Sequence, residues 1–341
     1  MKTPYLALIV ATACAGAAHA QSNVTIYGAL DAGLIKRSAS STAVGKRDAN
    51  TLGFRGVEEL GPGLKALFQL EIRYEPDTGT VESAVRPLFQ GQSRVGLQGG
   101  FGTLRIGRGT TSFMDSVIAF EPFHGIPSPA GFYSDVAVAG YTSQPLDPAG
   151  NSFNRISNAA FYNSPEYNGM QINATVATRE AGGGAALIGR GTTLLPQYRA
   201  NAEASANPFS ISATYKNPVV GAMVALERNG VESKLWSVAG SVKPIKDLKL
   251  MAIYGHQDRG HTMAANEATK AWVVGANYSV ASGTVLLGYG RKEPEGVTRT
   301  RQLSIGYEYA LSKRTFVYAD ASRKQAASRV NHLDLGMRST F

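Results

Sequence analysis

The sequence predicts an all-β protein, an antiparallel barrel of sixteen strands that crosses a membrane. Three observations support this prediction. Apolar and polar residues alternate along most of the chain, and short connections alternate with long ones between these segments. Beyond residue 20, no apolar run approaches the ~20 residues that a membrane-spanning helix needs.

Residues 1–20 have the pattern of a cleaved secretory signal peptide. Lys2 supplies a positive start, an apolar stretch covers 5–16, and Ala18-His19-Ala20 is a cleavage site of the A-x-A kind. The only cysteine, Cys14, lies inside this segment. We therefore expect Sec-dependent export and a mature barrel domain of residues 21–341 that contains no disulfide.

Period-two alternation marks the strands. In 64–74, Phe68, Leu70 and Ile72 alternate with polar and charged residues, and the same pattern recurs at 170–176, 272–279 and 302–309. Such alternation predicts strands with one apolar and one polar face. No helical periodicity of comparable length competes with it.

The connections divide into two kinds. Seven are tight turns at 59–63, 99–102, 165–169, 216–218, 243–247, 281–283 and 311–313. Eight are longer polar links at 38–47, 76–91, 110–153, 179–205, 229–232, 259–269, 292–298 and 325–331. Their alternation is typical of an up-and-down barrel with one short-turn rim and one long-loop rim.

A soluble β-sandwich is the alternative architecture. Strands of about ten residues suit a tilted membrane crossing, whereas globular strands usually have five or six residues. The polar faces also carry charged residues, which a dry core would accept only at a cost of several kcal/mol for each unpaired ion. A water-filled lumen removes that cost, so the sequence favours the membrane barrel.

The last strand reaches the end of the chain. Leu333, Leu335, Met337 and Phe341 share one parity. We expect this strand to close the barrel beside the first strand, near Val24, because a bilayer does not tolerate a free sheet edge.

At this point the sequence resembles the Gram-negative trimeric general porins, especially their β-proteobacterial branch. The most specific stretches are Leu-Gly-Phe-Arg-Gly at 52–56 and Phe-Gly-Thr-Leu-Arg-Ile-Gly-Arg at 101–108. Further matches lie at 22–28, 57–66, 121–125, 162–169, 311–315 and Phe341.

The resemblance implies a sixteen-stranded homotrimeric barrel in the outer membrane that passes small hydrophilic solutes by passive diffusion. It implies that the third long link, 110–153, folds into the lumen and that its acids face a basic cluster on the opposite wall. It also implies that Phe341 is the signal read by the barrel-assembly machinery.

A basic wall is the first half of the expected constriction. Strand parity points four arginines inward, because an arginine facing lipid near the midplane costs roughly 2–4 kcal/mol. Two more, at the ends of the long link, match family positions of the basic cluster. The six are Arg55, Arg73, Arg94, Arg105, Arg108 and Arg155. Individual members could instead pair with Glu71 or Glu75 and stabilise the wall.

Two carboxylates of the long link form the expected acidic half. Asp115 and Glu121 lie early in the segment. Asp115 could alternatively cap a short helix, as could its neighbours Thr110, Thr111 and Ser112. Glu121 is the stronger candidate for the lumen.

The charge balance indicates the partners. The whole chain has a formal net charge of +9. For an exported protein, anionic solutes and lipopolysaccharide are better partners than nucleic acid, for which no motif is present. With basic residues in excess at the constriction we expect an anion preference. No metal or cofactor motif is evident, since the glycines at 107–109 and 182–184 lack the strand-to-helix context of a phosphate site.

Two other functions remain open. A barrel-type outer-membrane hydrolase would need a histidine or second acid beside a nucleophile, and no catalytic motif places His124, His256, His261 or His332. A substrate-specific uptake channel or an adhesin would share the barrel pattern. Purified protein tested for hydrolase activity, and single channels tested for block by one solute, would separate these functions.

Overall fold

The computed structural model describes residues 23–83, 86–146, 152–179, 206–259 and 268–341. The predicted signal peptide, most of the link 179–205 and His261 lie outside these residues. Within them, no helix is long and apolar enough to cross a membrane.

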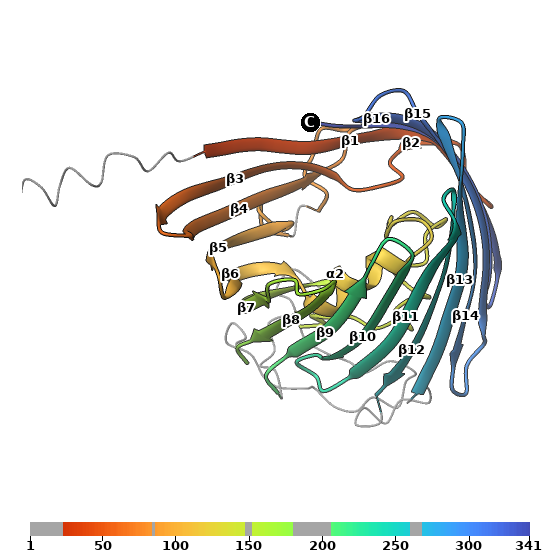
Figure 1. Cartoon of the computed structure of the whole chain (residues 1–341). Coiled ribbons are helices and arrows are strands. Elements are labelled where there is room, and N and C mark those ends of the chain that lie inside the picture. Colours follow the sequence, from red (N-terminus) through yellow and green to blue (C-terminus); the bar gives the residue numbers. More distant parts are fainter. Residues whose placement is uncertain (1–22, 84–85, 147–151, 180–205, 260–267) are drawn as a thin grey trace, which may run out of the picture.

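The described residues form one antiparallel sheet of seventeen strands (Figure 1). The strands are β1 Asn23–Arg37, β2 Ala43–Gly45, β3 Asn50–Gly61, β4 Leu64–Tyr74, β5 Gln92–Gly99, β6 Gly102–Thr110, β7 Arg155–Asn163, β8 Met170–Ala177, β9 Phe209–Lys216, β10 Val220–Arg228, β11 Lys234–Ile245, β12 Leu248–Asp258, β13 Ala268–Val280, β14 Gly283–Pro294, β15 Thr300–Ala310, β16 Thr315–Gln325 and β17 Arg329–Thr340. Two short helices, α2 Ser112–Val117 and η1 Ile118–Phe120, follow β6.

The sheet closes into a barrel of sixteen strand positions. The short β2 pairs with β1 at 33–35, and β3 pairs with β1 at 23–29, so the two together fill one position. On its other edge β1 pairs with β17, from Ala29 opposite Thr340 to Arg37 opposite His332. The predicted sixteen-stranded barrel is therefore confirmed, and its seam begins at Ala29 and not at Val24, which pairs with Gly56.

The seam depends on a close approach at Gly28. Phe341 donates its backbone N–H to the Gly28 carbonyl and accepts the Gly28 N–H, both at 3.1 Å. A Cβ on Gly28 would lie 2.3 Å from the Thr51 carbonyl oxygen and 2.6 Å from the Phe341 ring. Only a glycine at position 28 leaves room for Phe341 to pair with β1 and close the barrel.

The outer face of the barrel is apolar. Many large hydrophobic residues are more than 40% exposed, among them Val95, Ile172, Val224, Leu303 and Leu335. They occupy alternate positions along their strands, as strand parity predicted. This apolar surface can contact lipid hydrocarbon, while residues of the opposite parity face inward.

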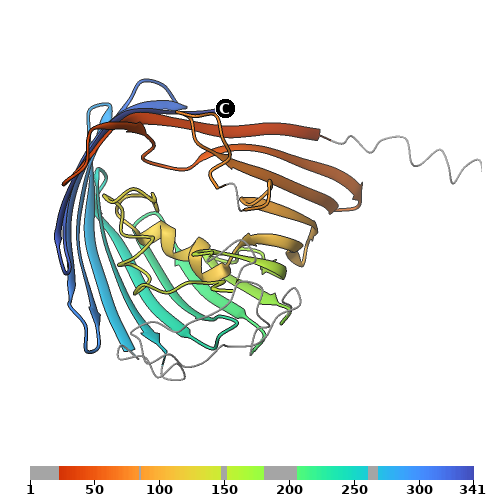
Figure 2. The ribbon, with the colours of Figure 1, turned by 180° about the vertical axis from the view of Figure 1, so that it is seen from behind.

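A second layer covers part of the inner face. The described part of the segment between β6 and β7, 111–146 and 152–154, lies on the concave side of the barrel, against β8 to β17 (Figures 1 and 2). Its Phe113, Phe123 and Phe132 are fully buried and share one apolar cluster with inward residues of β10 to β14, such as Leu235 and Val273. The lumen is therefore lined by bare strands on one side and by this segment on the other.

Replacing Gly28 by alanine should impair barrel closure. The added methyl group collides with the backbone of β3 and with Phe341, and we expect a loss of about 1–3 kcal/mol of folded stability. Urea titration of protein refolded in lipid vesicles, followed by the heat-sensitive gel shift of folded barrels, measures it. Gly100→Ala is the control, because nothing lies within 4 Å of a Cβ there; equal stability of the two variants would contradict the seam argument.

Candidate functional site

The helix α2 carries Asp115 on its exposed side. Thr111 is the N-cap, and its hydroxyl accepts the Met114 backbone N–H at 3.4 Å. The remaining residues of the helix face the wall: Ser112 donates its N–H to Thr175 at 3.0 Å, and Phe113 donates its N–H to Ser210 at 2.8 Å. Because Thr111 caps the helix, the Asp115 carboxylate is free to face the lumen.

Three of the predicted arginines lie together on the bare wall. Arg55, Arg94 and Arg105 line one cavity of about 180 Å³. Gln69 holds Arg94 in place, since its side-chain oxygen accepts from Nε at 3.0 Å and from Nη2 at 2.8 Å. The guanidinium carbon of Arg55 lies 5.2 Å from the centre of the Tyr27 ring. These contacts fix the direction of the guanidinium groups without neutralising them.

Arg155 and Arg73 extend this basic wall on its long-link side. Arg155 donates from Nε to the Gly91 carbonyl at 2.7 Å and from Nη1 to the side-chain oxygen of Asn154 at 2.7 Å. Both acceptors are neutral, so these two contacts do not neutralise its charge. Arg73 instead forms an ion pair with Glu71 at 3.0 Å. Arg73 thus takes the wall-stabilising role that the sequence left open.

Asp115 faces three of these charges. The residue is exposed on the lumen side of the helix, yet the helix and the barrel wall enclose its carboxyl group, and this enclosure raises its pKa to about 6. The guanidinium groups of Arg94, Arg155 and Arg105 act in the opposite direction and favour the carboxylate. One acid and three bases therefore interact electrostatically across this part of the lumen.

Arg108 does not face the lumen. It is 8% exposed, and its guanidinium donates to the Gln90 carbonyl at 3.1 Å and to Ser157 at 2.7 Å. A β-bulge between Gly107 and Gly109 shifts the register with β7 and turns this side chain toward the ends of the long link. The bulge explains how Arg108 reaches the inner side of the wall although its position has the opposite parity to that of Arg105. Arg108 anchors the link and is not part of the exposed basic wall.

Glu121 does not face the lumen either. It is 1% exposed, and its carboxylate accepts the backbone N–H groups of Phe123 at 2.9 Å, Gly125 at 2.6 Å and Phe132 at 2.9 Å. Burial raises its pKa to about 7, against the lowering effect of these hydrogen bonds. Glu121 organises the turn after η1, and the expected acidic face is reduced to Asp115.

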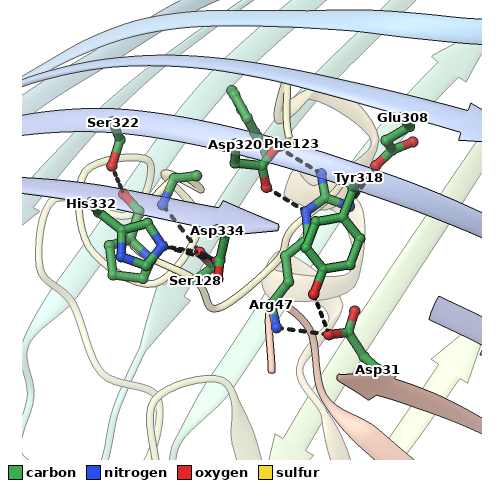
Figure 3. Close-up of polar contacts among 12 residues, drawn as sticks. Asp31, Arg47, Phe123, Ser128, Glu308, Tyr318, Asp320, Ser322, His332 and Asp334 are labelled. Carbon is green, nitrogen blue, oxygen red and sulfur yellow. Dashed lines mark hydrogen bonds and ion pairs between the residues drawn. The ribbon is translucent and has the colours of Figure 1, made fainter. Parts of the chain in front are cut away.

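A buried ionic cluster lies on the inner face of the barrel wall, beneath the long link (Figure 3). Arg47, from the first long link, is 1% exposed and pairs with Asp320 at 2.5 Å and Glu308 at 2.6 Å. The hydroxyl of Tyr318 donates to Asp31 at 2.7 Å. Strand parity alone does not reveal this cluster, although inward-facing acids on neighbouring strands are its signal, because buried carboxylates need a cationic partner.

Ser128, His332 and Asp334 meet beside this cluster (Figure 3), an arrangement that deserves comparison with a hydrolytic triad. His332 Nε2 lies 3.2 Å from the Ser128 hydroxyl and 2.9 Å from Asp334, and the serine also donates to Asp334 at 2.9 Å. A triad needs the acid on the other ring nitrogen. All three residues are at most 5% exposed. They fasten the long link to β17.

Further polar contacts hold the link along the wall. Asp135 pairs with Lys292 and Lys324. Gln302 donates to the Gly131 carbonyl at 2.9 Å, and Thr111 donates to Glu227 at 2.5 Å. Glycines make room for the segment: a Cβ on Gly275 would lie 2.4 Å from Pro122. The link is thereby a fixed inner layer, with Asp115 at its lumen surface.

The family model for Gram-negative porins matches residues 7–327. The chain belongs to the Gram-negative porin family. It is accordingly a passive channel protein of the Gram-negative outer membrane, and the family is one of channels and not of enzymes.

Relatives of this porin span nearly its whole length. It is 28% identical to outer membrane porin protein 32 of Delftia acidovorans, over 94% of this chain and 88% of that protein. It is 26% identical to the major outer membrane protein P.IB of Neisseria lactamica, over 92% and 91% of the two chains.

Solved structures share the barrel. The anion-selective porin from Comamonas acidovorans superposes with a TM-score of 0.76 at 20% identity, covering 94% of this chain and 100% of that one. OmpT of Vibrio cholerae in its trimer form gives 0.66 at 14% identity, covering 94% and 99%. At these identities the likeness concerns the fold alone.

Replacing Glu121 by alanine should loosen the inner layer of this porin. Three backbone N–H groups would lose their acceptor, at a cost of about 1–3 kcal/mol for each group left buried and unpaired. We expect faster proteolytic cleavage within 111–146 and noisier single-channel currents, with the barrel still folded. Asp77→Ala, at an exposed carboxylate of the second long link, is the control; a quiet channel in Glu121→Ala would remove the carboxylate from this role.

Proposed function

We propose that this porin passes small hydrophilic solutes and ions with a preference for anions, and that its narrowest section lies between helix α2 and the basic wall of Arg55, Arg94, Arg105 and Arg155. The observation that carries this proposal is the unequal charge across that space. Asp115 is the acid that faces these arginines, and Arg73 is paired with Glu71.

The size of the electrostatic effect is sufficient for selectivity. A unit charge 10 Å from a passing ion changes its energy by about 0.4 kcal/mol in water, which is about a twofold change in local concentration. Several uncompensated arginines multiply this effect, and the low dielectric of the surrounding wall strengthens it. Since the guanidinium groups are held by neutral side chains and carbonyls, their field remains available to anions.

The space on the short-turn side of α2 also has more basic than acidic side chains in its lining. A pocket of about 430 Å³ there is lined by Asp115 of the helix and by Lys243 and Lys249 of the wall. An anion that passes the basic wall thus meets further cations on its way. This arrangement favours small anionic and neutral solutes and requires no single preferred substrate.

We also propose the partners that the resemblance implies. The Vibrio cholerae structure is described as a trimer, and this porin is proposed to form a homotrimer. Phe341, at the seam of the barrel and 53% exposed, is proposed to be the residue that the barrel-assembly machinery reads. Lipopolysaccharide is proposed as the lipid partner in the outer leaflet.

Replacing Arg94 and Arg105 together by glutamine should weaken the anion preference. Each removed charge is expected to lower the anion-to-cation permeability ratio by about fourfold, because it lowers the local anion concentration about twofold and raises that of the cation about twofold. Reversal potentials of reconstituted channels under a KCl gradient measure the ratio, and native gels check that assembly is unchanged.

Arg108→Gln is the matched control for this experiment, because Arg108 is buried away from the lumen. Its reversal potential should stay close to that of the unchanged protein. A clear cation preference of the unchanged protein, or equal effects of the two sets of variants, would overturn the proposed constriction.

Anion preference should increase as the pH falls. With its pKa raised to about 6, Asp115 is charged at neutral pH and becomes neutral in mild acid, which leaves the arginines unopposed. Reversal potentials measured between about pH 7.5 and about pH 5 should move toward the chloride limit, with a midpoint near that pKa. The Asp115→Asn channel should be strongly anion-preferring at both pH values, and its reversal potential should no longer change with pH. A full pH response in Asp115→Asn would assign the titration to another group.

A further inference from the structure

Two stretches that resemble the porins, 22–28 and 52–56, pair with each other in the barrel wall. Tyr27 on β1 lies opposite Gly53 on β3. A Cβ on Gly53 would lie 2.3 Å from Cζ of the Tyr27 ring. The guanidinium carbon of Arg55, in the same stretch as Gly53, lies 5.2 Å from the centre of that ring. The glycine therefore lets the ring lie across β3, beside an arginine of the basic wall and within reach of β4.

The hydroxyl group of Tyr27 joins two side chains of β4. It accepts a hydrogen bond from Nε2 of Gln69 at 2.8 Å and donates one to Oε2 of Glu71 at 3.2 Å. Because the amide nitrogen of Gln69 is bound to this hydroxyl, the amide oxygen is left to face β5. There it accepts two hydrogen bonds from Arg94, at 3.0 and 2.8 Å. The tyrosine hydroxyl thus determines which end of the Gln69 amide meets Arg94.

Glu71 lies within reach of Arg94 along the wall. Gln69 is directly opposite Arg94 in the pairing of β4 with β5, and Glu71 follows two residues later on the same face. Such diagonal neighbours are about 7–8 Å apart, a gap that long side chains can span. One carboxylate oxygen of Glu71 binds Arg73, and the other accepts from Tyr27. Each oxygen of this carboxylate already has a donor, and Arg94 is bound to a neutral amide instead.

We propose that Tyr27 is a positioning residue for anion selectivity, and that its hydroxyl keeps Arg94 from forming an ion pair with Glu71. Without the hydroxyl, Nε2 of Gln69 loses its acceptor and the amide is free to rotate, while one oxygen of Glu71 loses its donor. A charge-assisted hydrogen bond from Arg94 is the strongest replacement for that donor. The resulting ion pair neutralises one charge of the basic wall. This role presupposes the proposed function, since it concerns the charge that attracts anions.

Reversal potentials under a KCl gradient test this role in four reconstituted channels: the unchanged protein, Tyr27→Phe, Glu71→Gln and the double variant. Tyr27→Phe keeps the ring that Arg55 contacts and removes the hydroxyl. Its anion-to-cation permeability ratio should fall about fourfold, as expected when one arginine charge is neutralised. A glutamine at position 71 cannot form an ion pair with Arg94. Adding Tyr27→Phe to Glu71→Gln should therefore leave the permeability ratio of the Glu71→Gln channel unchanged.

Tyr74→Phe is the matched control, since it removes one tyrosine hydroxyl from the neighbouring part of the wall. Tyr74 has the outward parity of the exposed Phe68 on β4, and its hydroxyl donates to the Ala29 carbonyl at 3.3 Å. Its permeability ratio should equal that of the unchanged protein. The heat-sensitive gel shift checks that each variant is a folded barrel.

Gln69→Leu tests the same role without changing the tyrosine. It removes the neutral acceptor of Arg94, so it should also lower the permeability ratio about fourfold. Combined with Glu71→Gln, it should leave the permeability ratio of the Glu71→Gln channel unchanged.

Three outcomes would overturn the role of Tyr27: an unchanged permeability ratio in Tyr27→Phe, an equal fall in Tyr74→Phe, or an equal fall with and without Glu71. The last is the result expected of a tyrosine that only packs the wall. The unchanged protein tests the proposed function separately, because a clear cation preference there would refute it. An anion preference that Tyr27→Phe does not alter would refute the role of Tyr27 and leave the proposed function standing.

Discussion

The docking of one long link onto the inner wall is the constraint on which the rest of the lumen depends. Phe113, Phe123 and Phe132 must be buried, so the inward residues of β10 to β14 are apolar there and not polar. Polar anchors such as Ser128 with Asp334 and Asp135 with Lys292 then set the position of the segment. What remains open to water is the opposite wall, where the arginines lie.

This division explains why the two carboxylates of the link have different roles. Asp115 lies on the side of α2 that faces water, whereas Glu121 follows the helices where the chain turns back against the wall. A buried carboxylate at the position of Glu121 is stable only if the backbone supplies its hydrogen bonds, and three N–H groups do so. The electrostatics of the lumen therefore follow from how the link packs.

Strand parity and the alternation of turns were sufficient to predict the barrel, because each strand obeys a local period of two. They also pointed Arg55, Arg94 and Arg105 inward. They could not predict Arg108, whose direction depends on a bulge, or Glu121, whose environment is created by packing within a non-repetitive link. Nor could they predict the role of Arg47, whose partners Glu308 and Asp320 are more than 250 residues away along the chain.

The inner layer also gives the barrel two mechanically different halves. Strands β8 to β17 are backed by a packed second layer, whereas β3 to β7 meet this layer only where the ends of the link contact β6 and β7, as at Arg108 and Ser152. Bending stiffness rises steeply with the thickness of a shell, so lateral pressure from the membrane would deform the thin half first. Because that half carries the arginines, elastic changes in the wall would alter the distance from the guanidinium groups to Asp115.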